Sequence, residues 1–256
     1  MLLLVASILV LFLLNLFLGS VHIPMDFIWN ILWGLDGDES VIWQNIIWKS
    51  RIPQSLTALV AGAGLAVSGL QMQTVFRNPL AGPSVLGISS GASLGVAFVV
   101  LLSGSIGGIA LSRLGFMGEI ALTVAAIVGA LSVMALIVYV SQKVHGNVTL
   151  LIIGVMIGYV ANAVIGVLKF FSVEEDIRAY VIWGLGSFAR VSGNQVTVFI
   201  CIMAVLLPLS FLLIKTLNLL LLGDAYARNL GLNIKRARLQ VIACSGVLVA
   251  IVTAYC

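Results

Sequence analysis

Apolar residues fill seven long segments of the chain, and shorter polar stretches separate them. The apolar segments cover about residues 2–18, 52–76, 85–102, 120–140, 150–168, 195–214 and 239–255. An α-helix rises 1.5 Å per residue, so about 20 apolar residues are needed to cross a bilayer. The pattern predicts an all-α polytopic membrane protein with about seven transmembrane helices, arranged as a single domain over residues 1–256.

The polar stretches between these segments predict surface elements. Residues 19–48 carry four acidic residues and four tryptophans, which are Asp26, Asp36, Asp38, Glu39, Trp29, Trp33, Trp43 and Trp48. Tryptophan collects at the membrane–water interface, so we expect this loop to lie along the membrane surface. Residues 179–188 are too few to span the bilayer and predict an interfacial or re-entrant helix anchored by Trp183.

Prolines mark where several predicted helices begin, bend or end. Pro53 suits the first turn of the second helix after Arg51, because a proline there gives up no backbone hydrogen bond. Asn78-Pro79 ends that helix, since the residue before a proline is driven out of the helical region. Pro208 is expected to kink the sixth helix. Residues 1–18 lack the basic start and clear cleavage site of a signal peptide, so we expect a retained helix.

Composition supports the membrane assignment and limits the partners. Hydrophobic residues make up 61% of the chain and charged residues 9%, whereas soluble domains carry about 25% charged residues. The mean hydropathy is +1.20. A formal net charge of +4, dispersed along the chain, does not predict nucleic-acid binding.

Basic residues indicate the orientation in the membrane. With a cytoplasmic N-terminus, seven of the 13 basic residues lie inside and six outside, which decides little by itself. The cluster of Arg228, Lys235, Arg236 and Arg238 favours the cytoplasmic side for residues 215–238. This polar segment also contains an amphipathic helical stretch at 223–230.

Catalytic and metal-binding patterns are absent from the sequence. Cys201, Cys244 and Cys256 lie in apolar runs without CxxC spacing, and the two histidines, His22 and His145, have no clustered ligands around them. Residues 82–89 have the glycine spacing of a P-loop, but Ile88 stands where lysine is required. Residues 184–189 mimic a dinucleotide fingerprint without a preceding strand. We predict no catalytic residue and no metal site, and a membrane enzyme is poorly supported.

Small and polar residues inside the predicted spans suggest close packing or a transport path. The second span carries Gly62, Gly64, Ser68 and Gly69, the third carries Gly87, Gly91 and Gly95 at every fourth position, and the fifth carries Gly154 and Gly158. These residues allow helices to approach closely, as static seams or as surfaces that slide during transport. Gln71, Gln73 and Asn162 either hydrogen-bond between helices or line a polar path.

Several runs together carry a family resemblance. They are Arg51-Ile52-Pro53, Gly62-Ala63-Gly64, Phe76-Arg77-Asn78-Pro79-Leu80-Ala81 with Pro83, Leu86-Gly87-Ile88-Ser89, Trp183-Gly184 with Gly186-Ser187, and Gly223-Asp224-Ala225 with Ala227 and Leu230-Gly231. In these runs the chain closely resembles the FecCD-type permeases, the membrane subunits of bacterial ABC importers for iron–siderophores, haem and vitamin B12. The resemblance covers nearly the whole chain.

The resemblance implies a ten-helix type II ABC importer permease fold with the N-terminus inside the cell. It implies a permease subunit of the bacterial cytoplasmic membrane that moves such a chelate by alternating access. The implied partners are a second permease subunit, identical or paralogous, two ATP-binding cassette subunits, an extracytoplasmic substrate-binding protein and membrane lipid. ATP and magnesium would bind the ATPase chains, so no cofactor is expected in this chain. The rival prediction is an ATP-independent channel or secondary carrier for a small solute, using the Gln71, Gln73 and Asn162 face.

The resemblance also assigns candidate sites. Residues 223–231 would form a cytoplasmic coupling helix against the ATPase, with the site residues Gly223, Asp224, Ala225, Tyr226, Arg228, Leu230 and Gly231. Leu222, Tyr226 and Leu230 recur at four-residue spacing as an apolar row, and Asp224 and Arg228 can form an i,i+4 ion pair. An ordinary amphipathic loop helix is the alternative. Asn78 and Pro79 are a structural break on the cytoplasmic side.

The expected contact with the substrate-binding protein lies on the outer face. The resemblance places Arg51 where a basic residue receives an acidic residue of that protein. Gln54 stands where some members carry a second arginine, so Arg178 or Arg190 would have to compensate. The family pattern continues beyond Cys256 into three more helices, so the chain is expected to be a truncated or partial product. The sequence leaves the identity of the chelate open.

Overall fold

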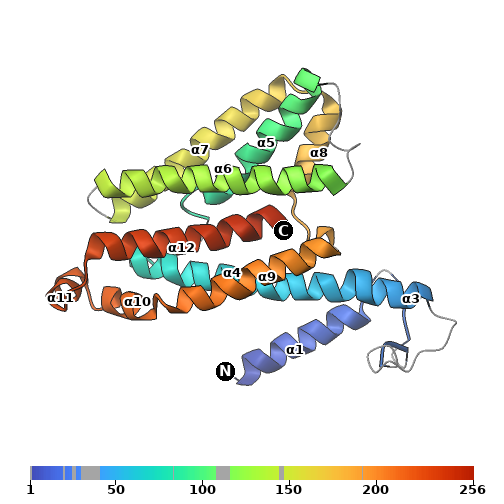
Figure 1. Ribbon diagram of the computed structural model, residues 1–256, viewed down its shortest axis with the longest axis horizontal. Coiled ribbons are helices and arrows are strands. Elements are labelled where there is room, and N and C mark those ends of the chain that lie inside the picture. The colour runs from blue at the N-terminus through green and yellow to red at the C-terminus, as the bar shows by residue number, and fades with distance from the viewer. Residues whose placement is uncertain are drawn as a thin grey trace. The chain divides into compact units, whose positions relative to one another are not determined.

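The computed structural model describes residues 2–19, 21–24, 27–29, 41–82, 84–107, 116–143, 147–191 and 193–256. These residues form helices joined by turns, and the described parts of the chain contain no strand (Figure 1). The all-α prediction is confirmed. The residues of the sequence analysis that lie outside the described parts are Asp26, Trp33, Asp36, Asp38, Glu39, Pro83 and His145.

A helix coincides with each predicted span. These helices are α1 (Leu2–Phe17), α4 (Ile52–Phe76), α5 (Ile88–Gly107), α6 (Phe116–Lys143), α7 (Asn147–Phe170), α9 (Asn194–Phe211) and α12 (Ile234–Tyr255). Within the described ranges, five helical segments are long and apolar enough to cross a membrane, namely 41–76, 117–143, 149–170, 194–211 and 234–255. The shorter elements are α3 (Val41–Ile46), the π-helical turn η2 (Ile47–Arg51), α8 (Glu174–Gly184), the 3-10 turn η4 (Phe188–Arg190), α10 (Ile214–Leu221) and α11 (Asp224–Asn229).

The second helical segment begins earlier than predicted. It runs continuously from Val41 through η2 into α4, so Pro53 lies inside a long helix and not at its start. Proline lacks the N–H that would bond the preceding turn, and a π-helical turn is one way for a helix to absorb such a break. The π-helical turn at Ile47–Arg51 directly precedes this proline.

The sixth span ends at Phe211, sooner than predicted, and Pro208 lies inside it. The α9 helix stops at Phe211, and the chain passes through a tight turn into α10 at Ile214. Leu212 and Leu213 donate backbone hydrogen bonds to residues three positions earlier, which is the 3-10 pattern. Leu217 and Leu220 then bury one side of α10.

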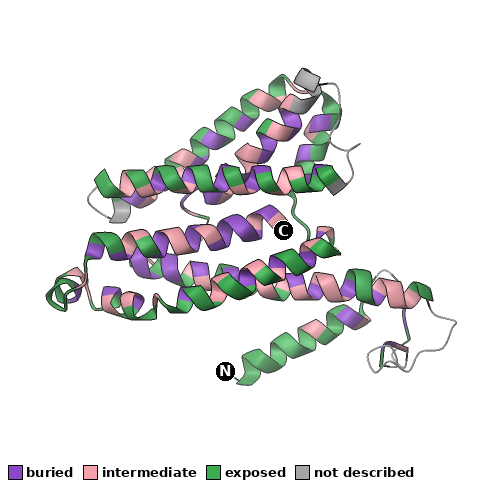
Figure 2. Ribbon diagram, viewed as in Figure 1, coloured by how far each residue is buried: buried purple, intermediate pink, exposed green. Residues whose placement is uncertain are grey.

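Contacts divide the chain into two compact units, where the sequence predicted one domain. The first comprises residues 1–61 and 187–201, and the second comprises residues 62–186 and 202–256. Within the first unit, Ile23, Ile28 and Ile47 form a small buried cluster. Trp43 packs edge-on against Phe27 beside this cluster, with ring centroids 4.8 Å apart. The α1 helix exposes most of its apolar side chains (Figure 2).

The second unit is built around α5, which packs against α6, α7, α8 and α12. The α12 helix lies alongside α6 and is largely buried (Figures 1 and 2). Trp183 of α8 lies in the core of this unit and is 8% exposed, so its predicted role as an interfacial anchor is wrong. The short helix around it exists, but it packs against α5.

The predicted glycine stripe of the third span divides between two neighbours. Gly91 and Gly95 face Gly129 and Ala125 of α6, where a Cβ on Gly95 would collide with the carbonyl oxygen of Ala125. Gly87 precedes α5 in a turn with φ +72°, so helical spacing does not extend to it. A Cβ on Gly87 would lie 2.9 Å from the carbonyl oxygen of Gly154 in α7. The α5–α6 and α5–α7 seams are therefore separate.

Candidate functional site

Two glycines define the short helix α11 at the predicted coupling segment. Gly223 precedes the helix with φ 105° and ψ 151°, a conformation almost restricted to glycine. Gly231 follows it with φ 86°, and the N–H groups of Gly231 and Leu232 bond the carbonyls of Arg228 and Ala227. This is the Schellman pattern that closes a helix C-terminus. The glycine spacing of the motif therefore has a backbone cause.

One face of α11 is buried and the opposite face is apolar but exposed. Ala227 is completely buried, whereas Leu222, Tyr226 and Leu230 are 60%, 69% and 62% exposed. The apolar row that the sequence predicted is thus directed away from the second unit's core. Contiguous apolar residues on an exposed face are typical of a surface that another protein covers.

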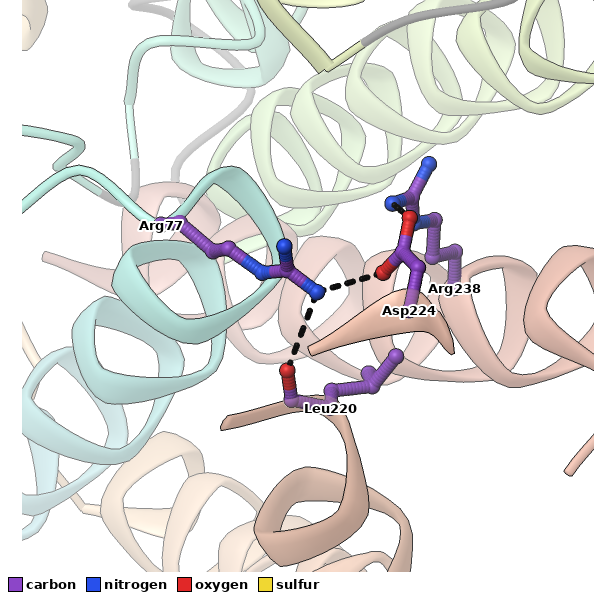
Figure 3. A network of polar contacts seen from close by, with 4 residues as sticks. All are labelled: Arg77, Leu220, Asp224 and Arg238. Atoms are coloured by element: carbon purple, nitrogen blue, oxygen red, sulfur yellow. Dashed lines mark hydrogen bonds and ion pairs between the residues drawn. The ribbon is translucent and has the colours of Figure 1, made fainter. Parts of the chain in front are cut away.

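Asp224 has different partners from the one predicted. Its Oδ1 accepts a hydrogen bond from Nη2 of Arg77 at 2.5 Å, and its Oδ2 accepts one from Nη2 of Arg238 at 2.6 Å (Figure 3). Both carboxylate oxygens are therefore engaged, and the predicted i,i+4 pair with Arg228 does not form. Arg77 also donates to the carbonyl oxygen of Leu220, at 3.3 Å, at the end of α10. The carboxylate thus connects α11 to the end of α4 and the start of α12.

Arg77 occupies an unusual backbone position at the predicted structural break. It is the only non-glycine residue with positive φ among the described residues, at φ 48°. The N–H groups of Arg77 and Asn78 bond the carbonyls of Thr74 and Gln73, which is again a Schellman pattern. Glycine is the usual residue here because a side chain is disfavoured in this conformation. The arginine instead directs its guanidinium group at Asp224.

Asn78 and Pro79 form the predicted structural break, a corner of the chain after α4, and Gln73 stabilises this corner. The Asn78 side chain accepts a hydrogen bond from the N–H of Leu80 at 2.9 Å. Gln73 donates through Nε2 to the carbonyl oxygen of Pro79 at 3.1 Å. The structure therefore uses Gln73 to hold the corner, whereas the sequence analysis left open an interhelical hydrogen bond or a place in a transport path.

Several other small and polar residues of α4 pack against α12. The hydroxyl oxygens of Ser68 and Ser245 are 2.6 Å apart, and Gln71 donates through Nε2 to Sγ of Cys244 at 3.6 Å. A Cβ on Gly64 would lie 3.2 Å from Val252. Gly62 is exposed and Gly69 is partly buried. Ser68 and Gln71 are buried and serve as interhelical contacts, and their place in a transport path stays a prediction.

Asn162 lies at a groove between α7 and the chain before α5. The groove has a volume of about 190 Å³ and is lined by Ser84, Val85, Gly87, Ser90, Gly154, Val155, Gly158, Tyr159 and Asn162. Its polar side chains are two serines, a tyrosine and the asparagine. Irregular backbone at membrane depth is tolerated where it is buried in protein or lines a water-filled cavity. Asn162, one of the predicted path residues, lines this groove.

The predicted docking residues are dispersed. Arg51 is 5% exposed, and its guanidinium group donates to the carbonyl oxygens of Leu16, Phe17 and Val21. The expectation that it presents its charge at the surface is wrong here, because it neutralises the free carbonyls at the end of α1. Gln54 and Arg190 are partly buried, and Arg178 is exposed. Arg178 belongs to a different unit from the other three.

Substitution of Arg51 by glutamine is expected to loosen α1. The change leaves carbonyl groups of α1 and of the following turn without their cationic donor, at a cost of about 1–3 kcal/mol for hydrogen bonds to a charged group. Limited proteolysis near residues 18–22 should become faster than in the unsubstituted chain. Arg51→Lys keeps the charge with fewer donors. Its rate of proteolysis should lie between the rates of the unsubstituted chain and of Arg51→Gln. Equal proteolysis rates in all three would contradict this role.

No group of three or more His, Cys, Asp or Glu side chains that could hold a metal ion occurs among the described residues. Two features of the site were missed by the sequence analysis. Arg77 and Arg238 are the partners of Asp224, and Ser245 and Cys244 are the partners of the α4 polar residues. A basic residue at a helix C-terminus directly before Asn-Pro was the one local signal for Arg77.

Comparisons with known proteins identify relatives of this chain. The hemin transport system permease protein HmuU of Yersinia pestis is 34% identical over 236 residues, which cover 91% of this chain and 67% of that protein. The vitamin B12 import system permease protein BtuC of Pectobacterium atrosepticum is 33% identical over 227 residues, which cover 88% and 63%. The chain therefore spans about two thirds of the length of these curated relatives.

A solved structure and a family description complete the comparison. The structure, of a protein assigned as a metal-chelate type ABC transporter in an inward-facing conformation, matches with a TM-score of 0.78 and 28% identity. The match covers 98% of this chain and 73% of that one. The five apolar helices and these permease relatives confirm the predicted multi-pass location in the bacterial cytoplasmic membrane. The sequence model of the FecCD transport family matches residues 7–256, and the chain belongs to that family.

Proposed function

We propose that this chain is the permease subunit of an ATP-driven importer that moves an iron–siderophore, haem or cobalamin-type chelate across the cytoplasmic membrane. The relatives described as hemin and vitamin B12 permeases support the class of cargo. The observation that carries the proposal is α11, whose buried face fixes it to the second unit while Leu222, Tyr226 and Leu230 remain exposed. An importer needs such a surface because the energy source is a separate chain.

In this proposal the partner chains supply what this chain lacks. Two ATPase subunits bind ATP and magnesium and cover the exposed row of α11. A second permease subunit, identical or paralogous, completes the path, and an extracytoplasmic binding protein delivers the chelate. The permease itself performs no chemistry: it opens to one side and then to the other. The groove at Asn162 supports a path with few specific contacts, because it offers only scattered hydroxyl and amide groups.

The exposed row provides the test of this function. Tyr226→Glu or Leu230→Glu introduces a charge that must be desolvated when an ATPase covers α11, at a cost of several kcal/mol. We expect co-purification of the ATPase and ATP-dependent uptake to be lost together, while the amount of permease in the membrane is unchanged. The measurement is ATPase recovery on affinity-tagged permease, followed by uptake of labelled haem, cobalamin and iron–siderophore in vesicles.

The matched control is Phe171→Glu. Phe171 is 74% exposed at the end of α7, in the same unit but on the predicted outer side. The same introduced charge should leave ATPase recovery intact there. Uptake that persists without any ATPase, or that survives both α11 substitutions, would favour the ATP-independent channel or carrier instead.

A further inference from the structure

The connection between α4 and α5 is a structured arm and not a simple loop. We define the connecting arm as residues 77–82 and 84–87. Its first residue, Arg77, lies at the level of Arg238, since both bond Asp224. The residue after it, Ile88, lies beside Gly246 of α12, where a Cβ on the glycine would be 3.1 Å from Cδ1 of Ile88. The α12 helix rises about 12 Å from Arg238 to Gly246, at 1.5 Å per residue, and the arm covers about this distance along α12.

Short hydrogen-bonded turns stiffen the arm. Ala81 donates its N–H to the carbonyl oxygen of Asn78 at 3.0 Å, Val85 donates to Gly82 at 3.3 Å, and Gly87 donates to Ser84 at 2.9 Å. The Asn78 and Gln73 side chains add the two bonds at the corner. These hydrogen bonds restrain the backbone of the arm locally.

The far end of the arm meets α7 at the groove. Leu86 is completely buried, and a Cβ on Gly154 of α7 would lie 2.9 Å from its Cα. Ser84 and Gly87 of the arm form one side of the groove, and Gly158 and Asn162 of α7 form the other. A displacement of the arm therefore changes the width of the groove, because the arm backbone and the Leu86 side chain pack directly against Gly154 of α7.

In the described part of the chain, the ion pair between Arg77 and Asp224 links the near end of the arm to α11, and Arg77 is a strained residue. Arg77 holds a left-handed conformation, with φ 48°, which is disfavoured for a residue with a side chain. The pair with Asp224 is about 40% exposed on both sides, so its own contribution to stability is small. Strain that brings little stability in return is typical of a functional position.

We propose that Arg77 is a positioning residue that transmits displacements of α11 to the groove through the connecting arm. The inference rests on the proposed function, in which an ATPase moves α11. When α11 shifts, Asp224 carries the guanidinium group of Arg77 with it. The stiff arm then moves Ser84 and Gly87 against α7. Arg238 holds the other carboxylate oxygen but belongs to α12, so it fixes α11 without reaching the arm.

The test places a thiol reporter in the groove. Ser84→Cys is introduced into a chain whose Cys201, Cys244 and Cys256 are replaced by serine, and its rate of maleimide labelling is measured in lipid nanodiscs with and without the ATPase and ATP. We expect ATP to change the rate by about fivefold or more, the lower end of coupling between linked sites. Arg77→Gln should reduce this change to less than about twofold while the ATPase remains bound.

Arg238→Gln is the matched control, because it removes the same charge from the same carboxylate but lies off the arm. It should retain most of the ATP-dependent change, and Arg77→Lys, which can still reach Asp224, should retain part of it. A second reporter, Val167→Cys on the exposed side of α7, reveals any general loosening. If Arg77→Gln fails to fold, Arg77→Lys and Asp224→Asn carry the comparison.

The outcomes separate this inference from the proposed function. An unchanged ATP response in Arg77→Gln, with the ATPase bound, overturns the role of Arg77 and leaves the importer assignment intact. If no ATPase binds the unsubstituted chain, the proposed function fails. The link is then judged without ATP, where Arg77→Gln should still alter Ser84→Cys labelling relative to Arg238→Gln. Equal labelling of the two variants in that condition would also overturn the inference.

Discussion

Substitution of Gly95 by leucine is expected to disrupt the packing of α5 against α6 and to give the largest loss of stability of any single change considered. A Cβ at Gly95 would collide with the carbonyl oxygen of Ala125 and lie 3.0 Å from Cα of Gly129. These are backbone atoms, so the neighbour cannot escape by changing a rotamer. Because α5 also contacts α7, α8 and α12, a shift of α5 disturbs the whole second unit.

The expected cost is about 3 kcal/mol or more, at the upper end for overpacking a tight contact. At roughly 2–4 °C per kcal/mol, the midpoint of thermal unfolding in detergent should fall by about 6–12 °C. The measurement is the monodisperse fraction by size-exclusion chromatography after heating. Gly95→Ala should show a smaller loss with the same sign.

Gly166→Leu is the control for this prediction. Gly166 lies within α7, and a Cβ there meets no atom within 4 Å. Replacing glycine in a helix adds about 0.5–1 kcal/mol of helix propensity, so the midpoint should stay level or rise. An equal fall of the unfolding midpoint in Gly166→Leu and Gly95→Leu would show that the α5–α6 contact is not the cause of the lost stability.

Substitution of Ala227 by leucine is expected to displace α11 and to abolish coupling to the ATPase. Ala227 is completely buried within the core of the second unit, and its backbone also closes the Schellman pattern with Leu232. The larger leucine side chain does not fit at this buried position, so α11 must move away from the core of the second unit. ATPase affinity should fall tenfold or more, which corresponds to about 1.4 kcal/mol or more, and chelate uptake should fall with it.

Ala225→Leu makes the same change two residues away on the exposed side of α11. It should leave the thermal midpoint of the isolated permease unchanged, whereas Ala227→Leu should lower it. A lower thermal midpoint in Ala227→Leu, with an unchanged midpoint in Ala225→Leu, would show that Ala227 holds α11 in place. Retention of binding in Ala227→Leu would contradict the assignment of α11 as the coupling helix.

The sequence predicted elements better than it predicted partners. Each apolar segment forms a helix because helical hydrogen bonds join residues four positions apart. Such a segment satisfies its own backbone polar groups, which a bilayer requires. Deviations occurred at helix bounds: Pro53 lies within a helical segment that begins earlier than predicted, and α9 ends at Phe211, earlier than predicted. The short helix at residues 223–231 was also predicted from the sequence, because Gly223 and Gly231 adopt positive φ angles that favour glycine.

Only the tertiary structure decided which side chains meet. Asp224 lies four positions from Arg228 but bonds Arg77, which is 147 positions away in the chain. Arg51 appeared to be a surface charge, yet the end of α1 buries it. Gln73 resembled a path residue but holds the corner at Pro79. Such contacts depend on how helices distant in sequence approach each other, and no local pattern encodes that approach.

What the sequence by itself determined is the number and position of the apolar helices, the break at Asn78-Pro79 and the family to which these features belong. What the tertiary structure decided is the division of the glycines of the third span between α6 and α7, and the link from α11 through Arg77 to the groove. The physical reason is the range of the interactions. Hydrophobic length and backbone conformation are properties of neighbouring residues, whereas close packing and ion pairing are properties of helices brought together by the fold.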